Sequence, residues 1–348
     1  MSHNPPSAQA FAAIIIDSRG TTALHQAAGK GTLKDLSGVT AELLATVKDN
    51  DGRTPLHHAA LYGHLDQIPG VTVEFLATVK NDYGWTPLEH AASKGHLDQI
   101  PGVTVELLAT VKDNDGQTPL HTAASYGNLA QILGVTAEFL ATVKNDYGRT
   151  PLHIAAYHGH LDQIPGVTAE FLATVKDNDG ETPLHVAARC GYRDQIPGVT
   201  AEFLANVKSN NDNTPLHLAA LCGHLDQVPG VTAELLATVK DNGGKTPLHY
   251  ATDYNHLAQI PDITITLATT LGLLNAALRP ENIAAFTEDF RCHGAHYNHC
   301  PTVSTALIEA ANQLPDLSPT QRTAIKTALS AAQEGGFVLP SETLARLL

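Results

Sequence analysis

The chain contains 348 residues, of which 43% are hydrophobic but only 5% aromatic, so its cores should consist mainly of Ala, Leu, Ile and Val rather than of a large mixed sheet. A formal net charge of −14 with 21 Lys and Arg residues argues against a nucleic-acid partner, because binding phosphates requires cations; a partner with a basic surface fits better. No segment approaches the roughly 18 to 20 consecutive apolar residues that span a bilayer.

The N-terminal segment, residues 1–16, precedes a long repetitive region. It has no Lys or Arg ahead of its short apolar run, and Asp17 follows that run directly. This arrangement lacks the shape of a secretory signal. We therefore expect a cytoplasmic protein in which residues 1–16 cap the first repeat.

Residues 17–261 repeat themselves every 32 residues. The string TPLH or a near copy begins at eight positions: Thr22, Thr54, Thr86, Thr118, Thr150, Thr182, Thr214 and Thr246. A unit of this size cannot bury its apolar face alone, so neighbouring units must stack into a solenoid.

One unit, residues 49–80, illustrates the elements that are expected. The turn residues DNDG predict a tight hairpin with a positive φ at the glycine. Thr54 then caps a helix whose first position is Pro55, where a missing N–H costs nothing, and Gly63 ends that helix.

The second half of the same unit, HLDQIPGVTVEFLATVK, predicts a bent and shortened helix. Pro69 and Gly70 interrupt the helix after about one turn, and Thr72 can cap a second short piece. Four apolar side chains are expected to be buried: Leu65, Ile68, Phe75 and Leu76.

The recurring pattern DxxGxTPLHxAAxxGHL resembles the ankyrin repeat over about seven tenths of the chain. The resemblance implies an all-α solenoid of helix-turn-helix units with β-hairpin-like fingers. Two features depart from that family: the period is 32 rather than about 33 residues, and LDQIPG breaks the second helix. The LDQIP variant is similar to ankyrin arrays of intracellular bacteria and their secreted effectors, which implies a location in the cytoplasm or, after translocation, in a host cell.

Most of the nineteen histidines belong to the repeat motif. The resemblance implies that the histidine of TPLH links adjacent fingers by a hydrogen bond, so its role is structural rather than catalytic or metal-binding. Glu89 replaces it in the third repeat, and the adjacent His90 does not obviously restore the lost bond.

A second period of 64 residues is superimposed on the first. KDNDG occurs at Lys48, Lys112 and Lys176, whereas KNDYG occurs at Lys80 and Lys144. This second period indicates that the repeats were copied in pairs. In such an array the scaffold positions stay nearly identical, and the positions that differ between copies are the informative ones.

The positions that differ lie at the finger tips, just before the motif Thr, just after the motif His, and at the end of the first helix. In ankyrin repeats these are the fingertip and concave-face positions that touch partners, and Trp, Tyr and Arg dominate protein interfaces. We expect a monomeric protein-interaction scaffold whose partner-binding residues are Tyr62, Tyr83, Trp85, Lys94, Tyr126, Tyr147, Arg149, Tyr157 and His158. Trp85, the single tryptophan, is read as an exposed anchor; the alternative is that it packs on a neighbouring finger.

After residue 261 the repeat fails, and residues 262–348 predict a small helical bundle that caps the array. Helices are expected over PENIAAFTEDF from Pro280, over TVSTALIEAANQL, from Ser318 to about Gln333, and after Ser341.

One cluster of side chains in this region could bind a metal ion or take part in catalysis. RCHGAHYNHC places two thiols and three imidazoles within nine residues, and such ligands suit Zn²⁺. Three interpretations remain open: a plain loop between helices, a zinc site, or a Cys/His nucleophilic site of an enzyme that uses the repeats to dock its substrate. No other cofactor is expected. The zinc ligands would be Cys292, His296, His299 and Cys300.

Overall fold

The computed structural model describes residues 6–191, 196–254, 256–260, 263, 282–287, 289–291, 301–312 and 318–340. The chain divides into two compact units, Met1–Asn178 and Asp179–Leu348, and each is described by itself. The described residues form helices and turns, with two isolated bridges as their only β-type pairing. None of their helices combines the length and apolarity that crossing a membrane requires.

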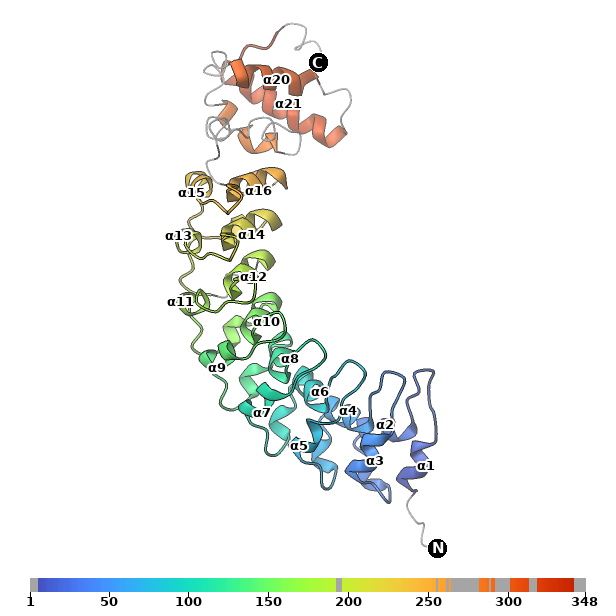
Figure 1. Ribbon diagram of the computed structural model, residues 1–348. Coiled ribbons are helices and arrows are strands. Elements are labelled where there is room, and N and C mark those ends of the chain that lie inside the picture. Colours follow the sequence, from blue (N-terminus) through green and yellow to red (C-terminus); the bar gives the residue numbers. More distant parts are fainter. Residues whose placement is uncertain are drawn as a thin grey trace. The chain divides into compact units, whose positions relative to one another are not determined.

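In the first unit, each repeat begins with a helix that carries the TPLH motif at its N-terminus. Consecutive first helices pack against one another in chain order (Figure 1). They are α2 (Ala23–Gly29), α4 (Pro55–Leu61), α6 (Pro87–Lys94), α8 (Pro119–Ser125) and α10 (Pro151–His158). Ahead of them, α1 (Ala8–Ala12) packs on α2.

Each repeat continues with a 3-10 turn and a second, shorter helix. The turns are η1 (Leu33–Asp35), η2 (Leu65–Gln67), η3 (Leu97–Gln99), η4 (Leu129–Gln131) and η5 (Leu161–Gln163). The second helices are α3 (Ala41–Thr46), α5 (Val73–Leu76), α7 (Val105–Thr110), α9 (Ala137–Thr142) and α11 (Ala169–Leu172). The predicted break at Pro69 is confirmed, and α5 restarts where the Thr72 hydroxyl accepts a hydrogen bond from the Phe75 N–H (3.2 Å).

Burial within the second half of the repeat confirms three of the four predicted core residues. Leu65, Ile68 and Leu76 are at most 7% exposed. The prediction for Phe75 is wrong, since its side chain is only half-buried. Val73 is 3% exposed and fills the core instead, because residues three apart lie on the same face of a helix.

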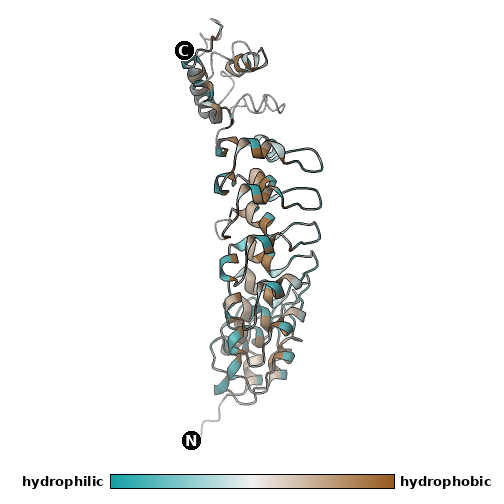
Figure 2. Cartoon of the chain, turned by 90° about the vertical axis from the view of Figure 1, so that its left-hand side faces the viewer, coloured by the Kyte–Doolittle hydropathy of each residue, from teal (hydrophilic) through white to brown (hydrophobic). Residues whose placement is uncertain are grey.

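The core of the first unit lies between stacked helices. The leucine of the motif is completely buried in each repeat of this unit, and full burial of such a side chain contributes about 1.5–3 kcal/mol. These residues are Leu24, Leu56, Leu88, Leu120 and Leu152. Figure 2 shows hydrophobic residues concentrated in the helices, whereas the finger loops are hydrophilic.

The fingers are turns held by side chains rather than by paired strands. Asp49 Oδ1 accepts hydrogen bonds from the N–H groups of Asp51 (3.0 Å) and Arg53 (2.8 Å). Gly52 has a φ of 73°, and a Cβ there would lie 2.3 Å from the Asp82 side chain in the next finger. Glycine is therefore required both by the turn and by the close approach of the neighbouring finger.

Successive fingers are joined by backbone hydrogen bonds, for example from Asp82 N–H to the Asp51 carbonyl (3.1 Å). In the first unit, every second finger adds a bond from an asparagine amide to the preceding finger, and Asn242 does the same in the second unit. The donor and acceptor residues are Asn50 and Ser18, Asn114 and Asp82, Asn178 and Asp146, and, in the second unit, Asn242 and Asn210. In the intervening fingers of the first unit the position holds Asp82 or Asp146, whose carboxylates cannot donate, whereas Asn210 occupies it in the second unit. Within the first unit, this alternation gives the 64-residue period a physical basis.

The second unit begins with repeats of the same kind. Its first helices are α12 (Pro183–Cys190), α14 (Pro215–Cys222) and α16 (Pro247–Asp253), and its second helices are α13 (Ala201–Ala205) and α15 (Ala233–Thr238). The 3-10 turns η7 (Leu225–Gln227) and η8 (Leu257–Gln259) follow α14 and α16.

The C-terminal part of this unit contains two of the predicted helices, α20 (Pro301–Asn312) and α21 (Pro319–Glu334), which pack together. Ser318 caps α21 as expected. Near residues 280–290 the described residues include the short 3-10 helix η9 (Ile283–Phe286) and, after it, α-helical residues at 287 and 289–291. The predicted boundary at 261/262 and the helix after Ser341 lie outside the described residues.

The C-terminal segment contacts the last repeat. The buried Asn282 donates a hydrogen bond from its amide to the Thr252 carbonyl (3.1 Å) at the end of α16, and η9 packs on η8. These contacts are consistent with the capping role predicted for residues 262–348, which stays a prediction.

Candidate functional site

The predicted partner-binding residues of the first unit fall into two rows. The helix-end row lies at the C-terminal ends of α4, α6, α8 and α10, and all of its side chains are exposed. Its members are Tyr62, Lys94, Tyr126, Tyr157 and His158. The tip row comprises Tyr83 and Tyr147, which are 64% and 62% exposed.

The tip tyrosines are positioned by the same turn that builds each finger. Asn81 Oδ1 accepts hydrogen bonds from the N–H groups of Tyr83 (3.0 Å) and Trp85 (2.9 Å). Asn145 Oδ1 does the same for Tyr147 and Arg149. Because the backbone is fixed, each tyrosine ring projects from a defined point.

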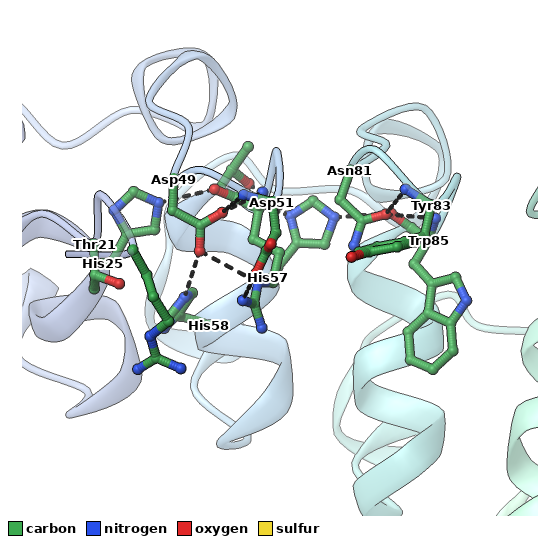
Figure 3. A network of polar contacts seen from close by, with 12 residues as sticks. Thr21, His25, Asp49, Asp51, His57, His58, Asn81, Tyr83 and Trp85 are labelled. Carbon is green, nitrogen blue, oxygen red and sulfur yellow. Dashed lines mark hydrogen bonds and ion pairs between the residues drawn. The ribbon is translucent and has the colours of Figure 1, made fainter. Parts of the chain in front are cut away.

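Beneath the fingers, the motif histidines form a ladder that fixes the spacing of the rows. The Thr54 N–H donates to His57 Nδ1 (3.0 Å), and His57 Nε2–H donates to the Trp85 carbonyl in the next finger (2.9 Å). Each histidine therefore caps its own helix and links two fingers (Figure 3). The same link to the next finger is made by His25, His121, His185 and His217. The structural role implied by the family resemblance is confirmed for these five residues.

Burial keeps the imidazoles of His57 and His121 neutral. It lowers the pKa of His57 and of His121 from 6.5 to about 4. His58, beside the ladder, has its pKa lowered to about 4 by burial and by the nearby His25, whose ring centroid is 5.1 Å away. The neutral tautomer with hydrogen on Nε2 is the one that the ladder requires.

Glu89 preserves only half of the function of the histidine it replaces. Its Oε2 accepts hydrogen bonds from the Thr86 N–H (2.7 Å) and hydroxyl (2.5 Å), so the helix cap is retained. Its buried Oε1 has no hydrogen-bond partner among the described residues, and neither has the buried Nε2 of His90. Burial raises the pKa of Glu89 from 4.5 to about 7.

Trp85 is half-buried rather than freely exposed. Its indole N–H donates to Asp113 Oδ2 in the next finger (3.2 Å), and its ring lies edge-to-face on His90, with centroids 5.4 Å apart. Figure 3 shows the indole extending away from the histidine network. The predicted full exposure of Trp85 is therefore wrong, because its side chain also packs on the neighbouring finger. The rest of its surface borders a pocket of about 690 Å³.

Arg149 occupies the same place in its repeat as Trp85 and remains exposed. Its guanidinium Nε lies 3.6 Å from Asp177 Oδ2, and its carbonyl accepts the bond from His121. Part of its charge is therefore already neutralised within the first unit.

Sequence reasoning missed Tyr254, which belongs to the second unit. It caps α16 as Tyr62 caps α4 and is 54% exposed. The glycine that follows this position in the other repeats is replaced by Asn255, so the equivalence of Tyr254 and Tyr62 was not apparent from the motif. Counting in steps of 32 residues from Tyr62 would have found it.

The C-terminal cluster Cys292, His296, His299 and Cys300 lies outside the described residues. Within the described ranges, no group of three or more His, Cys, Asp and Glu side chains could hold a metal ion. The zinc site and the Cys/His nucleophilic site therefore both stay predictions.

Comparison with known families gives one match. A family model described as ankyrin repeats in three copies matches six overlapping stretches: residues 6–68, 24–103, 70–139, 102–165, 135–197 and 197–261. Together these cover most of the chain. No curated protein matches it.

Proposed function

The chain belongs to the ankyrin-repeat family, and from this premise we propose that it is a scaffold that binds a partner protein through the helix-end and tip rows. Ankyrin repeats are generally protein-interaction modules. The proposal goes further in assigning the binding surface to these two rows of side chains.

One observation carries the assignment. Among the described residues, every aromatic side chain that is more than half exposed is a tyrosine at a finger tip or at the end of a first helix: Tyr62, Tyr83, Tyr126, Tyr147, Tyr157 and Tyr254. Folding leaves these rings more than half exposed, at 53–64%. Tyrosine combines a large apolar ring with a polar tip and loses little conformational entropy on binding, so it is frequent at interfaces.

The rigid support of these rings favours binding further. The cap and finger bonds made by His57 and its counterparts hold both rows before a partner arrives. Less conformational entropy is then lost on association, which preserves affinity.

A photocrosslinking experiment tests this proposal. A benzophenone amino acid is placed at Tyr126 in the helix-end row and, as a matched control, at Glu106, which is exposed on the second helix of the preceding repeat. We expect a discrete crosslinked partner from position 126 and none from position 106. Equal crosslinking from both positions would contradict the assignment of the surface.

Affinity measurements follow once the partner is identified. The triple change Tyr62→Ala, Tyr126→Ala and Tyr157→Ala should weaken binding at least tenfold, or about 1.4 kcal/mol, because interface tyrosines are often hot spots. Trp85→Ala tests the finger contribution, and an unchanged affinity would remove Trp85 from the interface.

A narrower proposal concerns where the scaffold acts. Its repeats resemble those of secreted effectors of intracellular bacteria, so the partner would be a host protein met after translocation, with the bacterial cytoplasm as the place of synthesis. A translocation reporter fused to the chain tests this idea during infection. Retention of the reporter in the bacterium would restrict the scaffold to the bacterial cytoplasm.

A further inference from the structure

The residue just before the motif Thr varies between repeats, and where it is cationic it is paired. Arg53 Nε lies 3.2 Å from Asp49 Oδ2, Arg149 Nε lies 3.6 Å from Asp177, and in the second unit Lys245 Nζ lies 2.9 Å from Asp253. In the third repeat this position holds Trp85. Its neutral indole N–H contacts Asp113, the residue that corresponds to Asp177 after 64 residues.

The pocket beside Trp85 is acidic. Its described lining includes three carboxylates, those of Asp51, Asp113 and Asp115, and one cation, Arg53. The Arg53 guanidinium is already engaged by Asp49 and, at close range, by Asp51. A negative charge is therefore left uncompensated on the other wall.

Two side chains on that wall have no polar partner among the described residues. The exposed Asp115 carboxylate has no hydrogen bond or ion pair among the described residues, although its N–H is bonded to Asp113. The buried Nε2 of His90, whose ring also lines the pocket, has no hydrogen-bond partner there either. Burial lowers the pKa of His90 to about 3, so its imidazole is neutral and does not repel a cation.

We propose that this pocket, formed by Trp85, Tyr83, His90, Asp113 and Asp115, receives an arginine side chain of the partner protein. This inference rests on the proposed function, because it names the chemistry that one part of the binding surface selects. The guanidinium lies against the indole ring and pairs with Asp115, as arginine does on aromatic faces and with carboxylates.

Arginine fits this pocket better than other cations. The position of Trp85 is occupied in the fifth repeat by the chain's own Arg149, whose guanidinium reaches Asp177, the counterpart of Asp113. A planar guanidinium can stack on the indole and bond a carboxylate at the same time, whereas an ammonium is a compact, strongly hydrated charge. The chain's net charge of −14 further favours a basic partner segment.

The single tryptophan provides a direct readout in the full-length protein. The probe is the capped tripeptide Gly-Arg-Gly, compared with the same peptide containing citrulline, which is neutral and similar in shape. The arginine peptide should change the Trp85 fluorescence saturably, and the citrulline peptide should bind at least about tenfold more weakly, because a charge-assisted bond is lost.

Two variants with the same change in charge locate the site. Asp115→Asn should weaken binding of the arginine peptide by about fivefold to tenfold, since an ion pair in a partly screened pocket is lost. Glu106→Gln removes one charge from an exposed residue of the second helix in the repeat that contains Trp85 and should leave binding unchanged.

A third variant uses the precedent within the chain. Trp85→Arg copies the arrangement at Arg149 and supplies the pocket with its own guanidinium, so it should abolish peptide binding. Because this variant lacks the tryptophan, binding is monitored by the amide NMR shifts of Asp115 and Gln117. A melting temperature close to that of the wild type shows that this variant is folded.

Three results would overturn the proposal: no saturable response to the arginine peptide, equal responses to arginine and citrulline, or equal losses in Asp115→Asn and Glu106→Gln. Any of them leaves crosslinking from Tyr126 unaffected. The pocket and the wider scaffold function can therefore fail separately.

Discussion

Replacing Glu89 with Gln should remove a pH-dependent loss of stability from the third repeat. Gln keeps a carbonyl oxygen that can accept the two bonds from Thr86, so the cap of α6 is preserved. Its amide also supplies N–H donors at the position of Oε1, which has no partner. The substitution therefore changes mainly the capacity to ionise.

The size of the effect follows from the pKa of this carboxyl. Burial is the dominant cause that raises the pKa of Glu89 from 4.5 to about 7, and the charge of Asp113 adds to it. Between these pH values the native state retains a proton that the unfolded chain has released, so the free energy of unfolding falls as the pH rises. The full loss, about 3 kcal/mol, is reached above pH 7 and is absent below pH 4.5.

Urea denaturation followed by Trp85 fluorescence measures this effect close to the substituted residue. Buried histidines such as His57 and His90 also titrate, but they are common to both proteins and cancel in the difference. We expect the two proteins to have similar stability at pH 4.5 and the Gln variant to be more stable by about 3 kcal/mol at pH 8. Stability curves that stay parallel from pH 4.5 to pH 8 would refute the assignment of a buried, ionisable Glu89.

Four further predictions concern other parts of the chain. His121→Ala removes the link to the Arg149 carbonyl and should cost about 2 kcal/mol in urea denaturation, because buried partners are left unsatisfied. Burial lowers the pKa of His57 from 6.5 to about 4, so its contribution is present above pH 6.5 and is lost as the pH falls to 4; His57→Gln should flatten acid denaturation followed by circular dichroism. Truncation after residue 261 removes the contacts of Asn282 and should promote aggregation in light scattering, whereas a soluble, cooperative product would contradict the capping role. If the C-terminal cluster binds zinc, elemental mass spectrometry of untagged protein should find about one equivalent, which the double change Cys292→Ser and Cys300→Ser should remove.

Much of the repeat could be predicted from sequence because its signals are local. Thr54 and Pro55 begin a helix through their own hydroxyl and ring, and Pro69 with Gly70 interrupts the next one. Which residues of a short helix face the core is harder to predict. The four residues of α5 turn Val73 inward and leave Phe75 half-buried, although both are apolar.

The candidate site was less predictable because it depends on contacts between repeats. The sequence marked Trp85 as unusual, but its burial depends on Asp113 and His90, which lie in a neighbouring finger and on the following helix. The capping role of the His57 Nδ1 atom was likewise invisible, since the motif alone suggests only the link made by Nε2. Comparing equivalent positions through the array was the signal that identified the exposed rows.

The asparagine amides that join alternate fingers also define how such an array can grow. Asn50 and Asn114 each reach back to the preceding finger, whereas Asp82 stands where such a donor would otherwise be. Within the first unit, inserting or deleting one repeat would place two fingers of the same type side by side and alter this alternation. Adding or removing two repeats together keeps an asparagine finger next to an aspartate finger at every junction of that unit. Two repeats are therefore the appropriate module for anyone who builds longer or shorter versions of the first unit.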